Sequence, residues 1–94
     1  MRAIIWGPTF KRSYKKMAQK RPDLREKVAE TLNLLVRDPF VAQLETHKLK
    51  GKLSGSWACS AGYDLRIVFD FVKGEKDKED NILLLAIGTH DEVY

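Results

Sequence analysis

The sequence predicts an α+β fold, in which an N-terminal strand and an antiparallel two-helix hairpin pack on an antiparallel sheet of three or four strands. Two observations indicate this arrangement. Apolar residues recur with a helical period in the first part of the chain and with a two-residue period in the last part. At 94 residues, with 44% hydrophobic and 32% charged residues, the chain suits one small globular domain over residues 1–94.

The first elements are a short strand and a helix. Residues 2–6 (RAIIW) form the expected strand, and residues 7–9 interrupt it, with Thr9 as the expected N-cap of the helix. The apolar residues of the following stretch, 10–20, share one face of a helix, and basic residues cover the remaining surface. The apolar set is Phe10, Tyr14, Met17 and Ala18; the basic set includes Lys11 and Lys15.

The second helix is expected between two prolines. Pro22 suits the first turn of a helix, and Pro39 excludes the residue before it from helical conformation, so the helix should end near Arg37. Its apolar stripe consists of Leu24, Val28, Leu32, Leu35 and Val36. Because few residues join the two helices, they should form an antiparallel hairpin.

After a connecting stretch, residues 39–46, the period of the pattern changes to two. Leu65, Ile67, Phe69 and Phe71 fall on one face of a strand, and Asp64, Arg66, Val68 and Asp70 fall on the other. Residues 73–80 form a charged turn, and residues 81–88 (NILLLAIG) form a strand that is apolar on both faces, as expected for a central strand. Loops this short normally join antiparallel neighbours.

Charge is distributed unevenly along the chain. Residues 1–63 contain 13 Lys and Arg against 5 Asp and Glu, a net charge of +8, whereas residues 64–94 contain 4 against 8, a net charge of −4. Such a basic excess suits a polyanionic partner, and equally suits a solvated lysine-rich surface. A single cysteine, no leader and no apolar run near the roughly 20 residues of a membrane span predict a cytoplasmic protein without a membrane partner.

Common catalytic motifs are absent. The sequence has no CxxC pair, HExxH, P-loop, GxGxxG or GxSxG pattern, so metal hydrolase, nucleotide-binding and serine hydrolase interpretations lack support. Its two histidines, His47 and His90, are not spaced as metal ligands with the scattered acids. We therefore expect neither a metal nor another cofactor.

Arg66 is the most informative single residue of the strands. It lies mid-strand, on the face opposite the apolar alternation, and so should project from the less apolar side of the sheet. An arginine there either pairs with an acid such as Asp64 or Asp70, or binds an anion, because a guanidinium fork matches phosphate as well as carboxylate.

Alternating lysines precede the strands. If residues 48–53 are extended, Lys48, Lys50 and Lys52 lie along one edge, where they would follow a phosphate backbone or protect the edge against strand addition. Trp57 would either stack on a base or pack into the sheet.

The last residues, IGTHDEVY, contain the remaining candidates. His90 follows the last strand, and its ordinary pKa near 6.5 suits proton transfer at neutral pH. Tyr94 lies near His90 if the tail turns helically and farther away if it extends. A basic surface, an arginine on an open face and these two side chains would together suit RNA cleavage by attack of the 2′-hydroxyl, although a frayed tail would suit any composition.

The segments HKLKGKLSGSW, GYDLRIVFDF and IGTHDEVY, in this order of elements, resemble the RelE toxin superfamily, specifically the RelE/YafQ-like mRNA interferases of bacterial type II toxin-antitoxin modules. The resemblance covers nearly the whole chain. It implies a toxin that enters the ribosomal A site beside 16S rRNA, cleaves mRNA there and inhibits translation, and that a cognate antitoxin holds inactive.

The resemblance also implies roles for individual residues. Arg66 would stabilise the scissile phosphate, His90 would transfer a proton, and Tyr94 would position or stack on the nucleotide and share the proton transfer. His47 and Asp64 match a histidine and an acid of the YafQ-like branch. Lys50 and Lys52 resemble its RNA-binding basic loop, which Lys48, Lys11 and Lys15 extend on the basic surface.

The chain departs from the family pattern in one segment. Many relatives have a basic side chain in the segment that corresponds to residues 57–61, and this chain has none there. The chemistry would then depend on Arg66 and the tail. A ParE-like inhibitor of DNA gyrase with the same fold, and a nucleic-acid-binding module without catalysis, remain alternatives.

Overall fold

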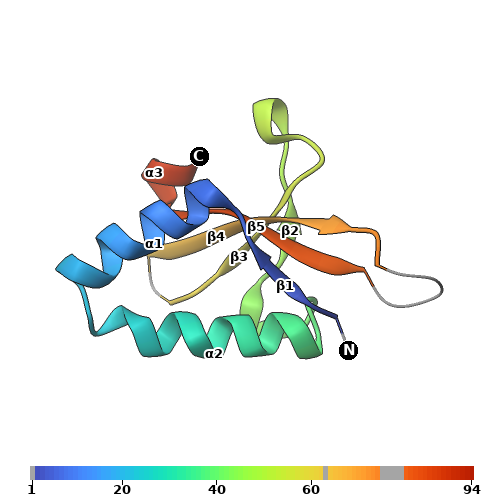
Figure 1. The fold of residues 1–94 in the computed structure, drawn as a ribbon. Helices are drawn as coiled ribbons and strands as arrows, with labels where there is room; N and C mark the ends of the chain where they lie inside the picture. The colour runs from blue at the N-terminus through green and yellow to red at the C-terminus, as the bar shows by residue number, and fades with distance from the viewer. Residues whose placement is uncertain (1, 63, 75–79) are drawn as a thin grey trace.

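The fold is seen in a computed structural model that describes residues 2–62, 64–74 and 80–94. The expected turn at residues 73–80 lies partly outside the described residues. Figure 1 shows the arrangement of the helices and strands. Their order is β1 (Ile4–Trp6), α1 (Pro8–Lys20), α2 (Leu24–Arg37), η1 (Ala42–Leu44), β2 (His47–Lys48), η2 (Gly51–Leu53), β3 (Trp57–Ser60), β4 (Leu65–Val72), β5 (Asn81–Thr89) and α3 (His90–Val93).

The predicted α+β class is confirmed, but the predicted sheet is wrong in two details. The sheet has five strands in the order β1-β5-β4-β3-β2 rather than three or four. It is mixed rather than antiparallel, because β1 pairs in parallel with β5, with Ile4 opposite Ile82. The predicted central position of the last strand is confirmed, since β5 lies between β1 and β4.

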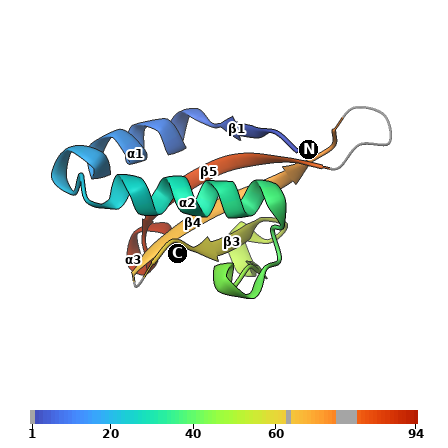
Figure 2. The same ribbon diagram turned by 90° about the horizontal axis from the view of Figure 1, so that it is seen from below.

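The two helices form the expected antiparallel pair, and their buried residues share one core with the sheet. Figure 1 shows α1 and α2 running in opposite directions, and Figure 2 shows α2 crossing the face of the sheet. The predicted end at Arg37 is confirmed. The start of α1 differs from the prediction, because Gly7 and not Thr9 is its N-cap. A Cβ at Gly7 would lie 2.6 Å from the Leu84 carbonyl oxygen, to which the Gly7 amide donates a hydrogen bond of 3.0 Å.

The hydrophobic core lies between the helices and one face of the sheet. Leu65, Ile67 and Phe69 of β4 are buried there, as the two-residue period predicts. Their buried partners include Phe10 from α1, Val28 and Leu35 from α2, and Ile82, Leu84 and Ile87 from β5. The other face of the sheet carries Arg66, and in Figure 1 both α3 and the segment 49–56 rise above that face.

No helix in the described part of the chain is long and apolar enough to cross a membrane.

Candidate active site on the open face of the sheet

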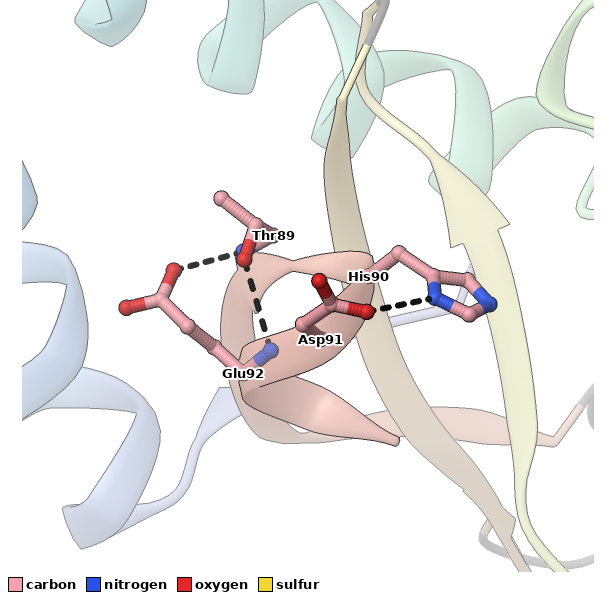
Figure 3. A network of polar contacts seen from close by, with 4 residues as sticks. All are labelled: Thr89, His90, Asp91 and Glu92. Atoms are coloured by element: carbon pink, nitrogen blue, oxygen red, sulfur yellow. Dashed lines mark hydrogen bonds and ion pairs between the residues drawn. The ribbon is translucent and has the colours of Figure 1, made fainter.

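The tail of the chain is a fixed helical turn. Thr89 caps α3 with a capping box: its hydroxyl accepts a hydrogen bond of 3.3 Å from the Glu92 amide, and its amide donates one of 2.8 Å to the Glu92 carboxylate. A Cβ at Gly88 would lie 3.0 Å from that of Glu92, so the turn packs directly on β5. Figure 3 shows His90 and Glu92 on opposite sides of this turn.

Tyr94 lies between the two histidines of the chain. Its ring centroid is 4.6 Å from that of His90 and 6.5 Å from that of His47, in edge contacts at 83° and 65°. The Tyr94 amide donates a hydrogen bond of 3.0 Å to the His90 carbonyl, so the tail turns helically rather than extending. The structure therefore brings together three residues that are separated by up to 47 positions in the sequence.

A backbone carbonyl orients the imidazole of His47. His47 Nδ1 lies 3.0 Å from the Glu45 carbonyl oxygen, and a carbonyl can only accept, so Nδ1 carries the hydrogen. Glu45 adopts a left-handed backbone conformation, with φ of 51°, at the end of η1, which positions this carbonyl. In the neutral ring, Nε2 is then an unprotonated base.

His90 has a different neighbour. Its Nδ1 lies 3.4 Å from the carboxylate oxygen of Asp91, which attracts a hydrogen on this nitrogen. Both side chains are exposed, so solvent screens this attraction. The two histidines on either side of Tyr94 thus differ in the acceptor that faces Nδ1, which is a backbone carbonyl for His47 and a carboxylate for His90.

Arg66 lies on the same open face of β4. Its Nη1 donates to the Ser60 hydroxyl at 3.3 Å, the Gly62 carbonyl at 3.3 Å and the Leu65 carbonyl at 3.1 Å. All three acceptors are uncharged. Opposite Arg66 in β5 is Gly88, which has no side chain to cover the guanidinium.

The suggested pairing of Arg66 with an acid is absent among the described residues. Asp64 is exposed at the start of β4 and forms no ion pair there. Asp70 lies farther along the strand, and its Oδ1 is buried without a hydrogen-bond partner in the described part of the chain. The guanidinium charge of Arg66 is therefore available to an anion.

Two groups near this site have raised pKa values. Partial burial raises the pKa of the Tyr94 phenol, against the opposing effect of the nearby positive charge of Arg66, so Tyr94 is a neutral hydrogen-bond donor at neutral pH. Burial raises the pKa of the Cys59 thiol to about 12. Cys59 is thus a core residue and not a nucleophile.

The lysines differ from the expected row. Residues 51–53 form the 3-10 turn η2, with Gly51 at φ of 71°, so the stretch is not extended. Lys50 and Lys52 line a pocket of about 310 Å³ together with His47, Leu49, Leu53 and Tyr94. Lys48 instead lies on the opposite side of β2, with Nζ 5.9 Å from the centre of the Trp57 ring. Of the two alternatives for Trp57, packing within the protein is present: its ring makes edge contacts with Phe40 and Phe71.

The helix cations Lys11 and Lys15 do not line the pocket beside Tyr94. Lys11 and Lys15 are exposed on α1, and Lys15 borders a pocket with Arg25 of α2. Lys16 and Lys20 are the lysines of α1 that border the pocket beside α3, which Glu92 also lines. Lys16 and Lys20 stand four residues apart and therefore share one side of α1, and this spacing is visible in the sequence.

Acidification should loosen α3. The hydrogen bonds from Thr89 lower the pKa of Glu92, so its stabilising contribution is complete above the ordinary glutamate pKa of about 4.3 and is lost as pH falls through the lowered folded value. Amide NMR signals of α3 should report this transition, and Glu92→Gln should remove it. Glu26→Gln, an exposed change on α2, should leave it unchanged. A transition that persists in Glu92→Gln would contradict the role of the capping box.

Comparison with known proteins identifies the family. The family model described as the bacterial toxin YafQ of type II toxin-antitoxin systems matches residues 2–94. The chain belongs to the YafQ toxin family. It is therefore a toxin of a type II toxin-antitoxin system, and the suspected resemblance to RelE/YafQ-like toxins is confirmed.

Solved structures of toxins share the fold of this YafQ-family chain. YafQ from E. coli strain BL21(DE3) is 22% identical, with a TM-score of 0.77 over 100% of this chain and 99% of the other. A copper-bound mutant toxin from Helicobacter pylori is 24% identical, with a TM-score of 0.76 over all of both chains. The YoeB dimer from Staphylococcus aureus is 20% identical, with a TM-score of 0.72 over 95% of this chain and 97% of the other. No curated protein matches the chain.

Sequence reasoning missed the residues that hold the site in place. Ser60 and Gly62, which accept hydrogen bonds from Arg66, come from β3 and the turn after it, and no motif marks them. Glu45, whose carbonyl orients His47, has no side-chain role that a sequence pattern could reveal. The capping box of Thr89 and Glu92 was readable, because Thr and Glu stand three residues apart.

Proposed function

We propose that this toxin is an endoribonuclease that cleaves mRNA in the ribosomal A site and so inhibits translation. One observation carries the proposal: Tyr94 lies between two histidines, on the sheet face that carries Arg66. A base, an acid and a fixed cation are the groups that phosphodiester cleavage by the neighbouring 2′-hydroxyl requires.

In the proposed reaction, His47 Nε2 takes the proton of the ribose 2′-hydroxyl. The 2′-oxygen attacks the adjacent phosphorus, the bond to the 5′-oxygen breaks, and His90 gives its proton to that leaving oxygen. The products are a 2′,3′-cyclic phosphate and a 5′-hydroxyl, and the two histidines end in exchanged proton states. The bond changes need no further reactant.

The other side chains would bind and orient the RNA. Arg66 stabilises the charge that develops on the phosphorane oxygens, because its guanidinium is held by three acceptors before the substrate arrives. Tyr94 contributes its ring to nucleotide stacking and its neutral hydroxyl to hydrogen bonding. Lys50 and Lys52, beside the same ring, contact the backbone phosphates. Asp64, exposed just before β4, is a further candidate.

Primer extension on an mRNA, with and without ribosomes, tests this function. We expect ribosome-dependent cleavage by the wild-type chain, and a loss of about 10²- to 10⁴-fold in each of His47→Ala and His90→Ala, the usual contribution of general acid–base catalysis. Lys73→Ala, an exposed change at the far end of β4, is the control. Wild-type cleavage patterns in both histidine variants would contradict the assignment. Inhibition of gyrase supercoiling with translation intact would instead favour the ParE-like alternative.

A cognate antitoxin is the second proposed partner. The structural relatives include an E. coli DinJ-YafQ complex, with a TM-score of 0.75 at 22% identity, and a YoeB-YefM complex from Staphylococcus aureus, with a TM-score of 0.72 at 21% identity. The net charge of +8 in residues 1–63 suits a partner rich in acidic residues. Such a partner would inhibit the toxin by covering the lysines beside Tyr94.

A further inference from the structure

A second feature lies on the other side of the sheet, beside the edge strand β2. The aromatic patch consists of Phe40, Trp57 and Phe71, whose ring centroids are 5.3 to 5.8 Å apart. It lines a pocket of about 440 Å³ at the end of α2. The Phe40 side chain is 56% exposed, the largest exposed fraction of any large hydrophobic residue among those the structure describes.

The chain holds Phe40 in this exposed position. The Phe40 amide donates a hydrogen bond of 3.0 Å to the Asp38 carboxylate, and the Val41 amide donates one of 3.2 Å to the Asp38 carbonyl. Pro39 between them is buried. This turn therefore keeps the Phe40 side chain at the surface.

Cations surround the aromatic patch. Lys48 Nζ lies over the Trp57 ring at 5.9 Å, and Arg2 and Arg37 line the pocket. Two acids, Asp38 and Asp80, also line it, so the three cations leave a net positive charge around the rings. A stacking surface with cations at its rim is the combination that binds single-stranded nucleic acids.

Strand β2 connects this patch to the proposed active site. Its two residues point to opposite faces of the sheet, because neighbouring side chains of a strand alternate. His47 faces Tyr94 on one side, and Lys48 faces Trp57 on the other. Since β2 is the last strand of the sheet, an RNA chain leaving the active site can pass around this edge without crossing a neighbouring strand.

We propose that the aromatic patch binds a nucleobase of single-stranded RNA outside the cleaved dinucleotide, with Lys48 and Arg37 contacting the flanking phosphates. The proposal rests on the proposed ribonuclease function, and it adds a second binding subsite to it. A protein segment would also cover an exposed phenylalanine. The cations around the rings favour the nucleic acid.

Tryptophan fluorescence can test this subsite directly. The chain has two tryptophans, so Trp6→Phe leaves Trp57 as the only reporter. The probe is a short 2′-O-methyl oligoribonucleotide, which cannot undergo 2′-hydroxyl attack and so reports binding without cleavage. We expect saturable quenching of Trp57, because a base stacked on the patch contacts the indole or its neighbouring ring.

Substitution of Phe40 should weaken this binding. Stacking of one base on an aromatic side chain contributes about 1–3 kcal/mol, so in the Trp6→Phe background Phe40→Ala should raise the Kd about 5- to 160-fold. Phe40→Leu keeps the apolar volume but loses the ring, so its Kd should lie between that of the parent and that of Phe40→Ala. Lys48→Ala should reduce the salt dependence of binding. Ile5→Ala, at another exposed apolar residue, is the matched control and should bind as the parent does.

The outcomes separate this proposal from the proposed function. Quenching that persists in His47→Ala and His90→Ala, while cleavage is lost, supports both. Quenching with no cleavage by the wild-type chain supports the subsite and contradicts the ribonuclease. Absence of quenching, or an unchanged Kd in folded Phe40→Ala, overturns the subsite. So does a Phe40→Ala variant that binds an antitoxin less tightly and the oligonucleotide normally.

Discussion

Replacing Arg66 with alanine should reduce RNA cleavage by about 10²- to 10³-fold, the usual cost of removing one preorganised group from an oxyanion site. The reason is the fixed position of the guanidinium. Three uncharged oxygens hold Nη1, and no acid among the described residues neutralises the charge. The measurement is the single-turnover rate of cleavage on programmed ribosomes.

Conservative variants separate the charge of Arg66 from its geometry. Arg66→Lys keeps the positive charge but loses the forked geometry of the guanidinium. Its cleavage rate should therefore lie between those of Arg66→Ala and the wild-type chain. Ser60→Ala removes one of the three acceptors and should have a much smaller effect. Circular dichroism should show a folded protein in each case, because Arg66 lies on the open face rather than in the core. Cleavage by Arg66→Ala at the wild-type rate would exclude Arg66 from the mechanism.

Removing residues 91–94 should abolish growth arrest when the toxin is expressed. The deletion takes away Tyr94, which lies between the two histidines, and Glu92, which completes the capping box that holds the turn of His90. The core should survive, because no residue of α3 belongs to the buried cluster. Growth curves and thermal melting of the purified protein measure the two effects.

Single substitutions of Tyr94 show which part of the side chain matters. Tyr94→Phe keeps the edge contacts with both imidazoles and should retain most of the activity, whereas Tyr94→Ala should lose most of it. A truncated protein that still arrests growth would contradict the role of the tail. An inactive Tyr94→Phe would show that the hydroxyl takes part in the proton transfer.

Much of the fold could be predicted from periodicity. The helical stripe of α2 and the alternation in β4 are long enough to identify both elements and their buried faces. The parallel pairing of β1 was not predictable from spacing, because Ile4 and Ile82 meet across 78 positions of sequence. Strand β2 has two residues, too few to show a period.

The site was predictable only in part. Its position on the open face follows from the alternation around Arg66, and the role of His47 came from the family resemblance rather than from spacing. The direction of Lys48 could not be read from the sequence, because it depends on where the extended backbone of β2 gives way to the turn η2. Exposed Phe40 was overlooked for a similar reason: its sequence neighbours predict a turn, but not which side of the ring meets solvent.

The capping box of α3 has a consequence for the number of residues in the tail. Side chains advance by about 100° per residue around a helix, so one inserted or deleted residue between Thr89 and Tyr94 would turn the phenol away from the histidine of β2. A change of residue type at Val93 or Asp91 would leave that direction unchanged. The tail should therefore keep a constant length among functional descendants of this chain.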